Sequence, residues 1–125
     1  MKPFHHARNS VKKWGGEINN YLPLHDWLDS SKAHHADMRH RALLHSSFGI
    51  YLLEQVFGTF ITNSDGIKVQ VRDIGEQHVL EDLGKIPCVS DYLNNMTLQP
   101  WMGGIEWKNR PKRKIISLED SDIVY

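Results

Sequence analysis

The stretch formed by residues 30–58 constrains the fold more than any other part of the chain. It contains no proline, it carries four of the eight histidines in its first half, and its second half is almost entirely apolar. Ser30 or Ser31 can cap a first helical turn, and Gly58 stands where a left-handed terminating residue belongs. The pattern predicts one long central helix over residues 31–57 with a polar start and an apolar end.

Helical periodicity assigns the two faces of this predicted helix. At 100° per residue, Ala42, Ile50 and Leu53 share one half, while His34, Asp37, Arg41 and His45 fall on the other half. From Phe48 onward the second half also becomes apolar. We therefore expect the last turns to be buried on most sides.

The composition favours a single globular domain. The 125 residues are 40% hydrophobic and carry no net charge, so a nucleic-acid partner is not expected from the overall field. A lone cysteine, Cys88, excludes an internal disulfide and suits a reducing cytosol. No apolar run of about 20 residues or signal-peptide pattern is present, which predicts a cytoplasmic protein without a membrane partner. The expected domain is 1–102, and the blocks of like charge predict a flexible tail over 103–125.

The remaining segments predict short elements around the central helix. Residues 3–14 predict a helix ended by glycine, and residues 17–29 predict two short helical pieces separated at Pro23. Residues 59–62 and 67–71 predict a β-hairpin, followed by a helix over 73–83 that ends at Gly84 and by a short helix in VSDYLNNM. The expected fold class is α+β, mostly α, with this single hairpin. Pairing of its free edge across a two-fold axis would give a homodimer.

Two segments predict a metal site. Three residues form an H-x-x-D-x-x-H pattern, and three more lie on one face of the helix over 73–83, so that each helix offers histidine and carboxylate ligands. The predicted ligands are His34, Asp37, His40, His78, Glu81 and Asp82. Because imidazole and carboxylate without thiolate suit Zn, Mn or Fe(II), a divalent transition metal is the expected cofactor. We expect the site to be centred on Asp37 and His40.

Two alternatives explain the same residues without a metal. The histidines and acids can form a network of hydrogen bonds and ion pairs with nearby arginines. Alternatively, Arg39, Arg41 and His45 can bind an anion such as phosphate. The pair His5 and His6 lies near the chain terminus, where such residues are usually solvated, so neither is expected in the site.

Several strings resemble a family of small uncharacterised proteins of bacteriophages and prophages. They are HHARNSVKKWGG, SKAHHADMRHRALLH, ITNSDG, VRDIGEQHVLEDLGKIP and QPWM, and they cover about residues 4–102. The resemblance implies a phage-related origin and a role in the cytoplasm of the infected bacterium. It implies no catalytic residue.

Two classes of function follow from these observations. The first is a metal-dependent hydrolase in which a metal-bound hydroxide attacks a phosphate-containing substrate oriented by Arg39 or Arg41. The second is a non-enzymatic phage accessory protein that binds a host protein or an anionic small molecule. The presence of bound metal in purified protein would favour the first class.

Overall fold

The computed structural model describes residues 1–103, and these residues are mostly helical. They contain six α-helices, three short 3-10 helices and one two-stranded antiparallel sheet. The chain divides into two units, residues 1–94 and residues 95–125. The predicted flexible tail lies outside the described residues, apart from its first position. Within the described part, every helix is too short to cross a membrane.

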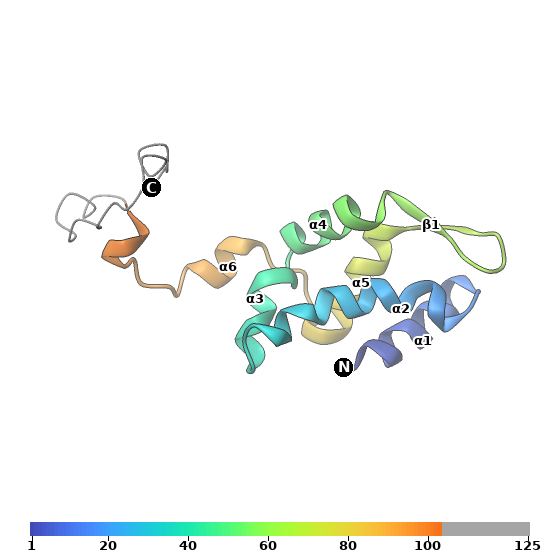
Figure 1. Ribbon diagram of the computed structural model, residues 1–125, viewed down its shortest axis with the longest axis horizontal. Helices are drawn as coiled ribbons and strands as arrows, with labels where there is room; N and C mark the ends of the chain where they lie inside the picture. Colours follow the sequence, from blue (N-terminus) through green and yellow to red (C-terminus); the bar gives the residue numbers. More distant parts are fainter. Residues whose placement is uncertain (104–125) are drawn as a thin grey trace, which may run out of the picture. The chain divides into compact units, whose positions relative to one another are not determined.

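Four helices build the first unit around one core. Helices α1 (Pro3–Trp14) and α2 (Ile18–Asp29) lie side by side, and α5 (Val71–Leu83) packs against both of them and against α4 (Ser47–Phe57) (Figure 1). The core consists of buried apolar side chains from these helices and from the hairpin, namely Ala7, Tyr21, Leu24, Leu28, Leu53, Val69, Val71 and Ile74. Burying such side chains supplies most of the driving force for folding.

The sequence predicted the outer helices and the hairpin correctly. Strands β1 (Phe60–Thr62) and β2 (Lys68–Gln70) pair antiparallel, with Ile61 opposite Val69. Helix α5 ends at Gly84, which has the left-handed φ of 74° that favours glycine. The short helix expected after Pro87 is α6 (Val89–Leu93).

The prediction of one long central helix is wrong. Residues 30–57 form 3-10 helix η1 (Ser30–Ala33), 3-10 helix η2 (Met38–His40), the short helix α3 (Arg41–Leu44) and α4. Two polar side chains compete for the backbone at the breaks. Asp37 accepts a hydrogen bond from the backbone N–H of Arg39, and Ser46 accepts one from that of Gly49. Both side chains act as N-caps, and each cap starts a new helix where the periodicity had suggested continuation.

The interruption predicted at Pro23 is also wrong, because α2 continues through it. Proline removes one backbone donor from the helix, yet Tyr21, Leu24 and Leu28 on the same helix are buried in the core. A side chain of this size gains about 1.5–3 kcal/mol on burial, which offsets the missing hydrogen bond.

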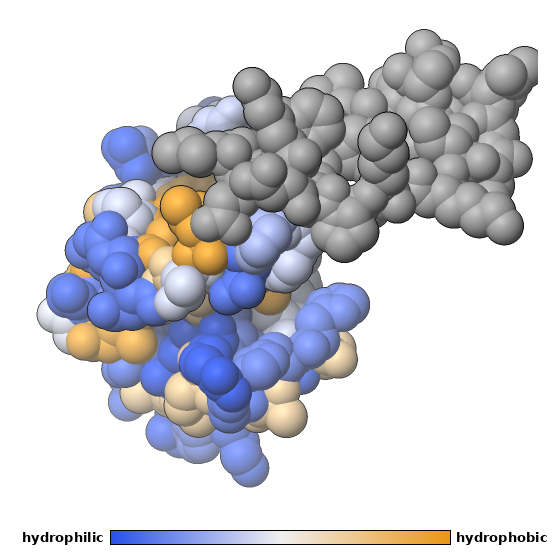
Figure 2. All heavy atoms as spheres, turned by 90° about the vertical axis from the view of Figure 1, so that its left-hand side faces the viewer, coloured by the Kyte–Doolittle hydropathy of each residue, from blue (hydrophilic) through white to orange (hydrophobic). Residues whose placement is uncertain are grey.

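The apolar turns of α4 are less enclosed than the sequence suggested. Phe48 and Val56 are 50% and 56% exposed, whereas Ile50 and Leu53 on the other side are buried. Helix α4 is therefore a surface helix with one buried face. On the face of the molecule drawn in Figure 2, hydrophobic residues lie in separate groups among hydrophilic ones.

Candidate functional site

Four acidic and histidine side chains converge in the interior between α2, α5 and the junction of α3 with α4. We call Asp29, His45, His78 and Asp82 the His–Asp group. One ligand atom from each residue lies within 4.8 Å of those of the other three. Nε2 of His45 is 2.9 Å from Oδ2 of Asp82 and 3.5 Å from Oδ1 of Asp29. Nε2 of His78 is 3.3 Å from each of these two carboxylate oxygens.

Local structure brings each member to this point. His78 and Asp82 are four residues apart on α5, so they share one face of that helix. His45 follows the last residue of α3 and has non-helical dihedral angles, φ −88° and ψ 65°, before Ser46 caps α4. The hydroxyl of Tyr92 donates to the carbonyl oxygen of His45 at 2.7 Å. The turn between two helices thus carries His45 inward.

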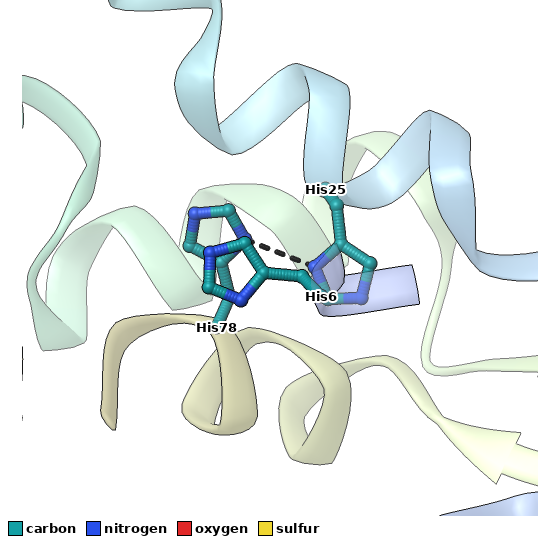
Figure 3. A group of neighbouring side chains, drawn as sticks. All are labelled: His6, His25 and His78. Atoms are coloured by element: carbon teal, nitrogen blue, oxygen red, sulfur yellow. Dashed lines mark hydrogen bonds between the residues drawn. The ribbon is translucent and has the colours of Figure 1, made fainter. Parts of the chain in front are cut away.

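Two further buried histidines lie behind His78. The rings of His6 from α1 and His25 from α2 stack on the ring of His78, with centroid distances of 3.8 Å and 5.2 Å (Figure 3). Nδ1 of His25 is 2.9 Å from Nδ1 of His78. His6, His25 and His78 can also be grouped as three metal ligands. However, His6 already directs Nδ1 to Glu81 at 2.7 Å and Nε2 to Asp82 at 3.1 Å, so both of its ring nitrogens are engaged.

A chain of neutral polar groups extends from His25. Nε2 of His25 is 2.8 Å from Oγ of Ser10, and Ser10 donates to Oε1 of Gln77 at 2.6 Å or to the carbonyl oxygen of His6 at 3.1 Å. The amide nitrogen of Gln77 donates to the same carbonyl oxygen and to Glu81. These side chains are buried apart from Glu81, so the interior here is polar and internally hydrogen-bonded.

Both carboxylates of the His–Asp group favour the ionised form. Burial raises the pKa of Asp82, but the hydrogen bonds from His45, His6 and His78 lower it by a larger amount. The pKa of Asp82 therefore lies well below its usual range. Burial likewise raises the pKa of Asp29, and the hydrogen bond from His78 more than reverses that shift. Two negative charges therefore lie together in a nearly water-free position, with side-chain exposures of 7% and 1%.

The histidines differ in the charge that they favour. Burial, together with the neighbouring His78 and His6, lowers the pKa of His25 to about 2, so His25 is neutral at physiological pH. Burial also lowers the pKa of His45. Burial lowers the pKa of His78 too, but its hydrogen bonds to Asp29 and Asp82 raise the pKa by more, to above its usual value. Without a metal ion, protonated His78 compensates the two carboxylates together with three cations at their outer side. The N-terminal ammonium lies 3.0 Å and Nη2 of Arg41 3.8 Å from Oδ1 of Asp82, and Nζ of Lys32 lies 3.9 Å from Oδ2 of Asp29.

Four buried polar atoms around the site have no hydrogen-bond partner among the described residues. They are Oδ2 of Asp29, Nε2 of His40, Nε of Arg41 and Nδ1 of His45. Buried polar atoms in folded proteins are nearly always satisfied, so such atoms indicate water or a ligand. Two of these four atoms belong to members of the His–Asp group.

The structure brings together only part of the metal site predicted from the sequence. His78 and Asp82 belong to the His–Asp group, whereas Glu81 is turned toward His6. His40 is buried, but its Nδ1 lies 2.8 Å from Oγ of Ser31 and it is outside the group. His34 and Asp37 are exposed.

Asp37, the expected centre of the site, instead pairs with Arg39 at the surface, with 2.6 Å between Oδ2 and Nη2. The arginine lowers the pKa of this carboxyl through its side-chain and backbone hydrogen bonds. The side chain of Asp37 is 52% exposed, so its charge needs no metal ion or facing helix to compensate it.

Of the three residues predicted to bind an anion, Arg41 and His45 both lie near Asp82, whereas Arg39 pairs with Asp37 at the surface. Arg39 is exposed beside Asp37, and His45 belongs to the His–Asp group. Arg41 lies near that group, with Nη2 3.8 Å from Oδ1 of Asp82. Anion binding by these residues stays a prediction.

His6, His25 and Asp29 were not predicted from the sequence as site residues. A signal for two of them was present, because residues 25–29 repeat the His-x-x-x-Asp spacing of residues 78–82. The helical piece predicted after Pro23 already places His25 and Asp29 on one face, but nothing in the sequence indicated that this face meets His78 and Asp82. No spacing pattern in the sequence linked His6 to the other histidines.

Comparisons with known proteins give a family but no activity. A search of the curated proteins and a search of the solved structures found no significant match. A family model described as a domain of unknown function, DUF6915, matches residues 1–102, which include the whole His–Asp group and the polar groups behind it. The chain therefore belongs to the DUF6915 family.

Proposed function

We propose that this protein binds a divalent transition-metal ion through Asp29, His45, His78 and Asp82. The observation that carries the proposal is the convergence of four ligand atoms from three separate segments of the chain. The four histidine-to-carboxylate distances are 2.9, 3.3, 3.3 and 3.5 Å. Ligands about 2.0–2.2 Å from a tetrahedral metal lie about 3.3–3.6 Å from one another, which is close to these four distances. The histidine pair and the carboxylate pair are within 4.8 Å, so the whole set is near the spacing that an ion needs.

Charge supports the same conclusion. Two ionised carboxylates and two neutral imidazoles carry a charge of −2, which a divalent cation can neutralise from inside the group. The N-terminal ammonium, Arg41 and Lys32 offset part of this charge from the outer side of the carboxylates. Nitrogen and oxygen donors without thiolate suit Zn, Mn or Fe(II). The polar network of protonated His78 with Asp29 and Asp82 is the metal-free alternative, and loss of one proton from His78 converts that network into the metal-binding form.

Elemental analysis of protein purified without a histidine tag tests the proposal. We expect about one ion per chain in the wild type and its loss in Asp82→Asn and His78→Ala, since each removes one of only four ligands. His34→Ala removes an exposed histidine and serves as the control that keeps the ion. Wild-type protein that folds normally but retains no metal, and takes up none when titrated with Zn²⁺, Mn²⁺ or Fe²⁺, would refute the proposal.

A metal-dependent hydrolase acting on a phosphate-containing substrate is the second candidate function. Two cationic side chains flank the carboxylates, with Nη2 of Arg41 3.8 Å from Asp82 and Nζ of Lys32 3.9 Å from Asp29. They could bind phosphate oxygens next to a metal that accepts more than four ligands, such as Mn²⁺. Hydrolysis of p-nitrophenyl phosphate or its diester, dependent on Mn²⁺ and abolished in Asp82→Asn, would support it. A metal-loaded protein inactive on both would favour a structural metal.

The remaining proposals concern origin and partners. We propose a phage-related protein that works in the cytoplasm of the infected bacterium, on the basis of the quoted sequence strings alone. A non-enzymatic accessory role, binding a host protein or an anionic small molecule, is the alternative to catalysis. Affinity capture of a tagged protein from infected and uninfected cells would test a host partner. A homodimer formed through the free hairpin edge is tested by sedimentation.

A further inference from the structure

The buried chain of His25, Ser10 and Gln77 is not used by the metal ligands themselves, yet it ends on one of them. It runs from α5 through α1 to α2 and reaches Nδ1 of His78. The opposite ring nitrogen of His78, Nε2, faces the carboxylates. The hydrogen-bond direction along this chain therefore bears on which nitrogen of His78 is free to bind a metal.

At the Gln77 end of the chain, the available donors and acceptors decide which atom donates in each hydrogen bond. One end of its amide faces the carbonyl oxygen of His6 and the carboxylate of Glu81, each at 2.9 Å, so that end is the NH₂ group. Oε1 is then the atom that faces Ser10. Both oxygens within reach of the Ser10 hydroxyl proton are acceptors, since they belong to Gln77 and to the His6 carbonyl. Ser10 must therefore accept its third hydrogen bond, from a proton on Nε2 of His25.

Metal binding at the other end of the chain requires the same donors and acceptors in these hydrogen bonds. A neutral His78 that binds a metal through Nε2 keeps its single ring proton on Nδ1. That proton lies between two ring nitrogens 2.9 Å apart and is accepted by Nδ1 of His25. The proton of His25 is then on Nε2, where it faces Ser10. The two ends of the chain thus require one and the same arrangement.

We propose that His25, Ser10 and Gln77 are positioning residues that hold the His78 ring as its Nδ1–H tautomer, with Nε2 directed at the metal. The inference rests on the proposed metal function and assigns these residues a role at that site. The stacking of His6 on His78 at 3.8 Å fixes the ring plane from one side. Partners of this kind orient a metal-ligating histidine and raise its basicity, and their loss typically lowers metal affinity 10–100-fold.

Ser10→Ala removes the acceptor of His25, and Ser31→Ala is a matched control. Ser31 is also a buried serine bonded to a buried histidine, His40, at 2.8 Å, but His40 is outside the His–Asp group. In a chelator competition with Zn²⁺, we expect the affinity of Ser10→Ala to be about 10-fold lower than that of the wild type, the low end of the range for a direct partner, because Ser10 acts on His78 through His25. Ser31→Ala should stay within about twofold. Equal affinities in wild type and Ser10→Ala would overturn this inference and leave metal binding standing. A wild type that binds no Zn²⁺ would overturn both.

Nitrogen-15 NMR of the histidine rings supplies a readout that a purely structural role would not move. In the wild type we expect His25 as the Nε2–H tautomer with and without Zn²⁺, and His78 as the Nδ1–H tautomer with Zn²⁺ bound. In Ser10→Ala without Zn²⁺, at a pH where His78 is neutral, we expect His25 in a mixture of tautomers, because neither end of the chain then fixes its proton. A proton on Nδ1 of His25 in the Zn²⁺-bound wild type would refute the proposed direction, whether or not the variant folds.

Discussion

Nε2 of His45 lies 2.9 Å from Oδ2 of Asp82, although 37 positions separate the two residues in the chain. His45 comes from a turn between two helices, and Asp82 comes from the last turns of α5. The contact therefore forms only when the tertiary structure forms. A metal ion that joins these residues would bind the folded chain and not the unfolded one.

Metal binding should raise the stability of the protein. A ligand that binds only the native state stabilises it by about 2.7 kcal/mol when its free concentration is 100 times the Kd. We expect this gain in urea unfolding with buffered free Zn²⁺, measured against protein in EDTA. Asp82→Asn should gain far less. Equal unfolding midpoints for the wild type with Zn²⁺ and with EDTA would contradict the expectation.

The metal-free protein should lose stability as the pH falls below 6.5. The pKa of His25 is lowered from 6.5 to about 2 in the folded state, so below pH 6.5 the unfolded state binds more protons. The free energy of unfolding then falls by up to about 1.4 kcal/mol per pH unit for this residue. The lowered pKa of His45 adds to this slope. His78, whose pKa is raised, acts oppositely, because its contribution is full below pH 6.5 and declines at higher pH.

Unfolding in urea with EDTA, measured between pH 5 and 7, tests this prediction. His25→Asn should show a shallower dependence on pH than the wild type, since it removes one titrating group. A wild-type free energy of unfolding that is constant or rises as the pH falls through this range would be inconsistent with a neutral buried His25.

Gly49→Ala should destabilise the protein strongly. A Cβ atom at Gly49 would lie 1.7 Å from the carbonyl oxygen of Leu44, which is backbone and cannot move without shifting the adjacent His45. Overpacking of this kind costs at least about 1–3 kcal/mol, and we expect metal affinity to fall as well. Ser47→Ala changes an exposed residue of the same helix and should alter stability by no more than about 0.5 kcal/mol. The urea midpoints of the two variants check the prediction.

Asp37→Ala should leave metal binding unchanged. Asp37 is exposed, and its loss removes a surface ion pair with Arg39 and an N-cap bond, neither of which touches the His–Asp group. Loss of bound metal in Asp37→Ala, found by elemental analysis, would return the site to the position expected from the sequence.

The sequence predicted the elements whose signals are local. Residues 3–14, the hairpin and the helix ended by Gly84 each depend on neighbouring residues, and each was found. The long helix failed because Asp37 and Ser46, which the periodicity treated as helical, cap new helices instead. The site was predicted in part for a related reason. His78 and Asp82 share one helix face, whereas the approach of His6 and His45 depends on packing that no spacing records.

The two His-x-x-x-Asp pairs on α2 and α5 divide the site between the helices. Helix α5 supplies two ligands, but in the pair on α2 only Asp29 reaches the metal position while His25 stays behind it. Neither helix, nor the turn that carries His45, holds enough ligands to retain an ion alone. The ion would thus bind only after three distant parts of the chain have packed together. A partly folded intermediate that lacks one of these contacts would not bind it.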